Sequence, residues 1–227
     1  MLRSAVRPPL PEAIVFDLDG TIVDTETVEY QSIREVWGEH GADYTVAHFE
    51  HVVGTSVGPD WVQELSAHLG RAIDTQRVRA SRQTVKVRLL SALGARPGIE
   101  ALIEEAAIAG IPMAVASNSP LDWVEARLHQ LQLHHHLSAL ITIDIAVRPK
   151  PHPAPYLQAC AALGAEPSRS IAFEDSATGV ASARAAGMYT IACPGPLTLG
   201  HDLSAAHRII GSHAELTLAD LAHAVRA

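Results

Sequence analysis

The sequence predicts an α/β fold, a Rossmann-like parallel sheet with helices on both faces. Short apolar segments that end in polar residues are the first observation, since they have the length and composition of buried strands: 13–16, 111–116 and 170–173. Segments with helical spacing that stop at glycines are the second observation. Strands that alternate with helices are typical of parallel sheets, because parallel neighbours need a crossover connection.

The first apolar segment leads into two aspartates, Asp17 and Asp19, and then into a turn at Gly20. Residues two apart on an extended chain project to the same side, so both carboxylates can share one pocket at the end of the strand. Ligands bind at that edge of an open α/β sheet. Two carboxylates held together are electrostatically costly unless a cation or a proton is present. An ordinary Asp-Gly turn would explain Asp19 and Gly20, but not Asp17.

Helical patterns predominate after this first motif. The spacing of apolar residues predicts four helices, over 25–40, 46–53, 60–69 and 75–93. Thr25 or Thr27 suits the N-cap of the first helix, and Asp60 suits that of the third. We therefore expect a helical domain over 24–92, inserted into a core domain that comprises 1–23 and 93–227.

The second part of the chain alternates regularly between strands and helices. The predicted helices cover 99–109, 120–133, 156–163, 176–186 and 216–225. The predicted strands cover 111–116, 139–144, 170–173, 189–193 and 208–210. Ser119 is a suitable N-cap and Pro120 a suitable first helical residue. We interpret His134–His136 as a solvated helix end, because adjacent histidines do not converge on one metal ion.

Composition excludes several classes of function. The 227 residues are 48% hydrophobic and carry 17 basic and 25 acidic side chains, a formal charge of −8. Because no basic tract stands out, nucleic acids and anionic membranes are poor candidates as partners. Cys160 and Cys193 have neither metal-site nor disulfide spacing, which favours reduced thiols. Residues 1–11 lack the apolar core of a signal peptide and are predicted to be a flexible arm, so we expect a cytoplasmic protein.

Four short motifs resemble the signatures of one enzyme superfamily, in the same order. Asp-Leu-Asp-Gly-Thr-Ile-Val-Asp-Thr-Glu at 17–26 resembles the first signature of haloacid dehalogenase-like (HAD) hydrolases, in their β-phosphoglucomutase/phosphoglycolate phosphatase group. Ser117-Asn118, Lys-Pro-x-Pro-x-x-Tyr from 150 to 156, and Glu-Asp-Ser-x-x-Gly from 174 to 179 resemble the other three. The family usually has Asp where Ala154 stands, which we interpret as a lost contact at a helix entry rather than lost catalysis.

The resemblance implies a role for each motif residue. Asp17 is implied to be a nucleophile and Asp19 a general acid/base. Ser117 and the backbone N–H of Asn118 are implied to bind the transferring phosphoryl group, and Lys150 to neutralise it. The implied Mg²⁺ ligands are the carboxylates of Asp17 and Asp175 and the main-chain carbonyl of Asp19, with Glu174 as a ligand or a close neighbour.

The resemblance also implies that the helical insert is a cap domain over the site. Candidate substrate-facing residues there and in the first motif are Thr21, Glu29, Thr55, Ser56 and Arg82. Asp24 is interpreted as a neighbour of the site or a hinge at the cap junction. The implied partner is a small phosphorylated metabolite, and we expect a monomer or a weak homodimer.

The most consistent function is a Mg²⁺-dependent phosphatase that acts on a small phosphomonoester through an aspartyl phosphate. A phosphosugar mutase is the alternative, but Glu29 occupies the position of the mutase cap histidine, and the 54–58 loop lacks the mutase arginine. A non-catalytic ligand-binding relative is the second alternative. Retention of all four motifs argues against it.

Overall fold

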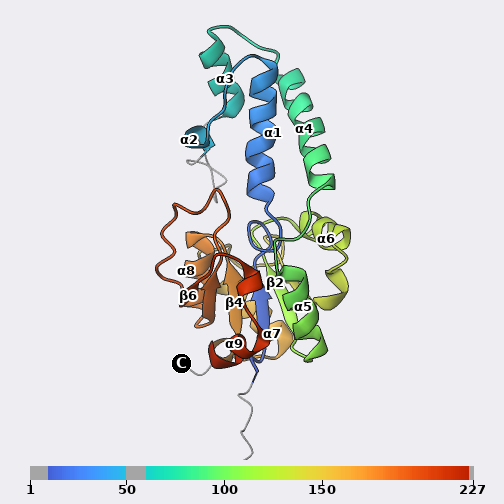
Figure 1. Cartoon of the computed structure of the whole chain (residues 1–227), viewed down its shortest axis with the longest axis vertical. Helices are drawn as coiled ribbons and strands as arrows, with labels where there is room; N and C mark the ends of the chain where they lie inside the picture. Colours follow the sequence, from blue (N-terminus) through green and yellow to red (C-terminus); the bar gives the residue numbers. More distant parts are fainter. Residues whose placement is uncertain (1–9, 50–59, 225–227) are drawn as a thin grey trace, which may run out of the picture. The chain divides into compact units, whose positions relative to one another are not determined.

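The structure, a computed structural model, describes residues 10–49 and 60–224 (Figure 1). In these residues six strands form one sheet in the order β3-β2-β1-β4-β5-β6, and every neighbouring pair is parallel. The strands are β1 (Ile14–Phe16), β2 (Met113–Ala116), β3 (Ala139–Ile141), β4 (Ile171–Glu174), β5 (Tyr189–Ala192) and β6 (Arg208–Ile209). The predicted parallel α/β sheet is therefore confirmed.

The two faces of the sheet carry different side chains. Val15 is in register with Ala114 and Ala172, and this small-residue face is covered by α7 (Ala154–Leu163) and α8 (Ala177–Ala185). On the opposite face the rings of Phe16 and Phe173 stack with centroids 5.1 Å apart. Small residues allow α7 and α8 to approach closely, whereas the aromatic pair fills the other side.

Further helices complete the core. The ring of His213 in the 3₁₀ turn η3 (His213–Glu215) packs against Phe173, and α5 (Ile99–Ile108) contacts both η3 and α9 (Leu218–Ala224). Another helix, α6 (Leu121–Gln130), follows β2 and contacts the 3₁₀ turn η1 (His134–His136). The three histidines thus form their own short turn rather than a helix end. A last 3₁₀ turn, η2 (Pro167–Arg169), precedes β4.

Strand order reverses beside β1, which pairs with β2 on one side and β4 on the other. The chain proceeds outward from β1 through β2 to β3, and from β4 through β5 to β6. Such a reversal leaves an open crevice at the carboxyl ends of the central strands. Residues that follow β1, β2 and β4 therefore meet at one place.

Four helices make a second compact unit, which comprises 24–49, 60–94 and 196–200 of the described residues. They are α1 (Thr25–Glu39), α2 (Val46–Phe49), α3 (Trp61–Leu69) and α4 (Thr75–Ser91), and α1 lies alongside α4 (Figure 1). This unit has its own core, in which Trp37, Tyr44 and Leu65 are buried. Residues 10–23, 95–195 and 201–224 make up the first unit.

Two helix starts differ from the expectation. Asp24 caps α1 by accepting the backbone N–H of Thr27 at 3.1 Å, so the prediction of Thr25 or Thr27 as N-cap is wrong. Ser119 does not cap α6 either; instead the Asp144 carboxylate accepts the N–H of Leu121 at 2.7 Å. Carboxylates are the stronger acceptors at a helix N-terminus, because the helix dipole also favours their charge.

Asp60 is the N-cap of α3, as predicted, and accepts the N–H of Val62 at 3.0 Å. Ser176 is the N-cap of α8 and accepts the N–H of Gly179 at 3.1 Å. None of the described helices is long and apolar enough to cross a membrane.

Buried His213 makes the stability of the fold depend on pH. In the described residues neither ring nitrogen has a hydrogen-bond partner. Burial, reinforced by the Arg96 cation, lowers the pKa of His213 from 6.5 to about 3. Because the unfolded chain binds this proton and the folded chain does not, stability falls as the pH drops below about 6.5. Urea unfolding at pH 7.5 and pH 5.5 should show that the wild type loses about 1.4 kcal/mol more than His213→Leu. An identical pH dependence in the two proteins would contradict this assignment.

Candidate active site

Three acidic side chains lie together at the carboxyl ends of β1 and β4. Asp17 directly follows β1, Glu174 ends β4 and Asp175 comes next. The pairing of the two strands brings them together, and the N–H of Asp17 donates to the carbonyl of Phe173 at 2.9 Å. Carboxylate oxygens of the three residues lie within 4.8 Å of one another, and all three residues are buried. Among the described residues this is the group with the composition of a metal site.

Lys150 supplies positive charge to this group. Its Nζ lies 2.7 Å from Oδ1 of Asp17 and 2.6 Å from Oε1 of Glu174. The side chain of Asn118 holds the Lys150 backbone in both directions, because Oδ1 accepts the Lys150 N–H at 2.9 Å and Nδ2 donates to the Lys150 carbonyl at 3.2 Å. The sequence suggested only the backbone N–H of Asn118 as a phosphate ligand. Its side chain has the additional role of positioning the lysine.

Both oxygens of Glu174 are engaged. Oε1 accepts the Tyr156 hydroxyl at 2.6 Å in addition to Lys150, and Oε2 accepts the N–H of Asp175 at 3.2 Å and the hydroxyl of Ser176 at 3.2 Å. Glu174 is therefore held in one orientation and holds Lys150 in turn. Tyr156 was not singled out from the sequence, although it ends the Lys-Pro-x-Pro-x-x-Tyr motif.

Electrostatics in this group favour an added cation. Burial raises the pKa of Asp17 to about 7, although the Lys150 ammonium opposes this shift. Burial alone would lower the pKa of Lys150, but Asp17 and Glu174 outweigh it, and the net shift is upward. Of the described donors, none reaches Oδ2 of Asp17, which is buried. Three carboxylates around one ammonium leave an excess of negative charge, and a buried unpaired oxygen among them fits a divalent cation.

Two glycines leave room for the acidic side chains. Gly20 has a φ of +92°, and a Cβ there would lie 2.1 Å from Oδ2 of Asp175. A Cβ on Gly179 would lie 1.8 Å from Oε1 of Glu174. Both distances are far below any allowed contact, so the positions of the Glu174 and Asp175 carboxylates depend on the absence of a side chain at these two glycines.

The side chain of Asp19 is held by residues at the start of α6. Its Oδ2 accepts the Ser119 hydroxyl at 2.6 Å, and its Oδ1 accepts the indole Nε1–H of Trp123 at 2.9 Å. The hydroxyl of buried Ser117 accepts the N–H of Ser119 at 3.0 Å, which leaves its own proton to donate. Thr21 is also buried, and among the described residues its hydroxyl has no partner.

Arg96 is a further contributor that the sequence did not indicate. Its guanidinium donates to the carbonyl of Gly20, to that of Cys193 at 2.7 Å and to that of Pro194 at 2.8 Å. These bonds attach the turn after Asp19 to the end of β5. These hydrogen bonds could not be predicted from a local sequence pattern, because the acceptors lie 76 or more positions from Arg96 in the chain.

The other predicted substrate-facing residues belong to the helical unit or lie outside the described residues. Glu29 forms ion pairs with both Arg82 and Lys86, and Arg82 also donates from Nε to the Ser32 hydroxyl at 3.1 Å. Thr55 and Ser56 fall within 50–59, outside the described part.

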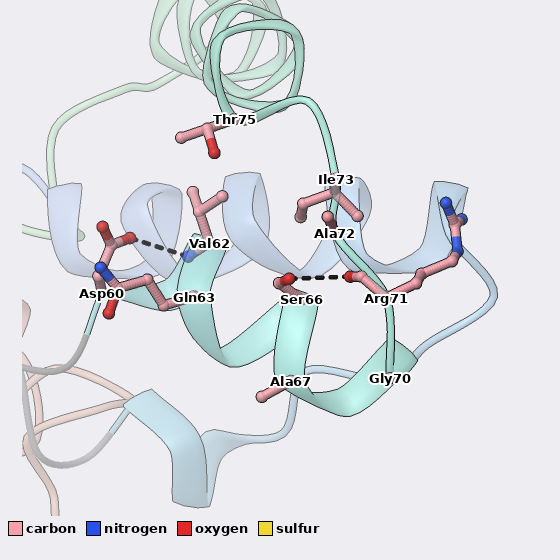
Figure 2. Close-up of a pocket in the computed structure, with 10 residues that line it drawn as sticks. All are labelled: Asp60, Val62, Gln63, Ser66, Ala67, Gly70, Arg71, Ala72, Ile73 and Thr75. Atoms are coloured by element: carbon pink, nitrogen blue, oxygen red, sulfur yellow. Dashed lines mark hydrogen bonds between the residues drawn. The ribbon is translucent and has the colours of Figure 1, made fainter.

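The helical unit also contains a cavity of about 560 Å³ beside α3 (Figure 2). Its lining includes Asp60, which is tied to the start of α3, and Ser66, which donates to the carbonyl of Arg71 at 2.8 Å. Of the sequence-predicted site residues that the structure describes, none lines this cavity. The acidic group at the sheet, with its buried charges, remains the better candidate for chemistry.

Comparisons with known proteins identify the class. The family model for haloacid dehalogenase-like hydrolases matches residues 11–187, so the chain belongs to this family and is a hydrolase. YhcW of Bacillus subtilis (strain 168) is 33% identical over 187 residues, 82% of this chain and 85% of its own. The fructose-1-phosphate phosphatase YqaB of Escherichia coli (strain K12) is 31% identical and covers 77% of this chain and 92% of its own.

A solved relative shares the fold. The crystal structure of CbbY from Rhodobacter sphaeroides in complex with xylulose-1,5-bisphosphate has a TM-score of 0.71 and 28% identity, and it covers 91% of this chain and 96% of its own. The resemblance of the four motifs to HAD hydrolases, in the β-phosphoglucomutase/phosphoglycolate phosphatase group, is thereby confirmed.

The requirement for glycine beside Glu174 can be tested with a matched pair of variants. We expect Gly179→Ala to destabilise the protein by about 1–3 kcal/mol, because a new methyl group collides with a buried carboxylate. Gly38→Ala, also in a helix but with open space around it, should be neutral or stabilising by up to about 1 kcal/mol. Thermal unfolding of both variants checks this. Equal effects of the two substitutions would argue against the collision.

Proposed function

We propose that this protein is a Mg²⁺-dependent phosphatase that hydrolyses a small phosphomonoester through an aspartyl-phosphate intermediate. The observation that carries the proposal is the contact of Lys150 with both Asp17 and Glu174. Asp175 lies next to this contact, and one oxygen of Asp17 is reached by no donor in the described part of the chain. A phosphate dianion repels nucleophiles, so an enzyme that attacks it must first supply positive charge and alignment. This group of residues can do both.

The metal would be held by oxygen ligands. The carboxylates of Asp17, Glu174 and Asp175 lie close enough together to contribute ligands. The main-chain carbonyl of Asp19 is the further ligand that the first motif implies. Mg²⁺ prefers a few carboxylates and keeps sites for water and phosphate, which suits this number of ligands. When bound, it supplies the charge that neutralises the phosphate oxygens and keeps Asp17 ionised.

Asp17 serves as the nucleophile in the first half of the reaction. Its Oδ2 forms a bond to phosphorus while the bond from phosphorus to the ester oxygen breaks. Ser117 and Lys150 each offer a proton donor at the carboxyl end of the sheet, where the phosphoryl oxygens would lie. The backbone N–H of Asn118 is the third proposed donor.

Asp19 acts first as a general acid and then as a general base. In its protonated form it gives a proton to the departing ester oxygen, which leaves as an alcohol. The resulting carboxylate then takes a proton from a water molecule, whose oxygen attacks phosphorus and releases Asp17. Inorganic phosphate leaves, and both aspartates are back in their starting states.

Substrate class and domain roles are part of the proposal. YqaB is named for fructose 1-phosphate and CbbY binds a sugar bisphosphate, which supports a sugar phosphate or a similar metabolite here. Transfer to water is favoured over mutase chemistry, since Glu29 stands at the position of the mutase histidine and is held in ion pairs with Arg82 and Lys86. We assign the helical unit the role of a cap that excludes water during the reaction.

Loss of the nucleophile should abolish activity. We expect Mg²⁺-dependent phosphate release from a panel of sugar phosphates and p-nitrophenyl phosphate for the wild type. Asp17→Asn should lower the rate by roughly three orders of magnitude or more, because an amide cannot form the acyl phosphate. Activity that survives the substitution would refute the assignment of Asp17. Absence of release from every ester by the wild type would refute the phosphatase itself.

Metal binding can be measured without turnover. Mg²⁺ should raise the unfolding temperature of the wild type, because a ligand that binds only the folded state stabilises it. Asp175→Asn should weaken the apparent Mg²⁺ affinity at least about tenfold, whereas Asp43→Asn, an exposed aspartate of the helical unit, should not change it. A Mg²⁺ response that is the same in both variants would contradict this ligand set.

A further inference from the structure

Trp123 is the residue near the site whose role neither the motifs nor the family match explains. It lies in the first turn of α6, half-buried, and its indole N–H donates to Oδ1 of Asp19 at 2.9 Å. The two residues are 104 positions apart in the chain. An indole nitrogen can only donate, so in this contact Asp19 is necessarily the acceptor.

The orientation of Trp123 is itself fixed by packing. The guanidinium carbon of Arg127, one turn further along α6, lies 5.1 Å from the centre of the Trp123 ring, within cation–π distance. Residues four apart on a helix lie on the same side, so this stacking is a property of α6 itself. The indole is therefore held in place independently of Asp19.

Ser119 and Trp123 donate hydrogen bonds to different carboxylate oxygens of Asp19. Ser119 donates to Oδ2 at 2.6 Å, while Trp123 donates to Oδ1 at 2.9 Å. Both donors come from the segment after β2, which also carries Ser117. Hydrogen bonds to both oxygens of a carboxylate fix the plane of the group, and with it the direction in which either oxygen can exchange a proton.

We propose that Trp123 is a positioning residue, which together with Ser119 orients the carboxyl group of Asp19 for proton transfer to the leaving group. The proposal rests on the phosphatase function and deepens it. Asp19 must face the ester oxygen within hydrogen-bond distance when the bond to phosphorus breaks. A side chain that is free to rotate spends only part of its time there, and misplacement of a catalytic group by about 1 Å is costly to the rate.

The role of Trp123 predicts a dependence on the leaving group that a purely structural residue would not cause. An alkyl phosphate releases a strongly basic alkoxide, which needs the proton of Asp19. A p-nitrophenyl phosphate releases a stable phenolate, which does not. Impaired positioning of Asp19 must therefore slow the first reaction much more than the second, whereas general damage to the site slows both.

Trp123→Phe is the informative substitution, because it removes the N–H and keeps an aromatic ring over Arg127. We expect kcat/KM for a sugar phosphate to fall about tenfold, as for loss of a hydrogen bond to a charged group, and kcat/KM for p-nitrophenyl phosphate to fall less than about twofold. Ser119→Ala should shift the ratio of the two values in the same direction. His129→Gln, an exposed position on α6, should leave both values unchanged.

A second measurement tests the contact without catalysis. The chain has three tryptophans, so a ¹⁵N-labelled sample gives three indole signals, and Trp123→Phe identifies one of them. Asp19→Asn should shift that signal and leave the other two in place. An unchanged indole signal would overturn the proposal, as would equal losses with both esters or no loss with either. A wild type that releases phosphate from neither ester would refute the phosphatase function, and with it any role in proton transfer.

Discussion

The contact of one buried ammonium with two buried carboxylates is the interaction on which the site depends. Lys150 lies within 2.7 Å of both Asp17 and Glu174, and each of these three groups would be costly to bury alone. The free-energy cost of burying these charges is offset by their pairing with one another. It is also offset by hydrogen bonds to Glu174 from the Tyr156 hydroxyl and the backbone N–H of Asp175. Removal of any one partner would leave an unpaired charge in the core, so the group is a unit rather than a collection of separate residues.

Sheet topology explains why that unit can exist. The strand order reverses around β1, so the turns that follow β1, β2 and β4 lie at the same edge of the sheet, where open α/β sheets bind their ligands. Within it, the glycines at 20 and 179 provide the space that the carboxylates of Asp175 and Glu174 occupy. The backbone thus brings the strand ends together and leaves space for the carboxylates. Hydrogen bonds made by Asn118 and Arg96 hold the neighbouring turns in position.

Much of the fold and part of the site could be predicted from the sequence. Strand ends can be recognised locally, and a parallel sheet brings its strand ends together, which is why Asp17, Glu174 and Asp175 were found correctly as neighbours. Contacts that depend on side-chain direction between distant elements were not predictable. Ser119 illustrates this limit: its intrinsic preference for an N-cap is overridden because Asp19, 100 positions away, accepts its hydroxyl proton, while Asp144 caps α6 instead.

The two aspartates of the first motif thus have different surroundings although one residue separates them. Asp17 is bound to a cation and belongs to a group with excess negative charge, which suits a nucleophile that works beside a metal. The carboxylate of Asp19 accepts hydrogen bonds from Ser119 and Trp123 of another segment, and these bonds fix its direction. In the proposed reaction this carboxyl group gives a proton to the leaving group and later takes one from water, so its direction relative to the ester oxygen must be fixed. The separation of the two roles therefore follows from which side chains each carboxylate meets, not from the motif itself.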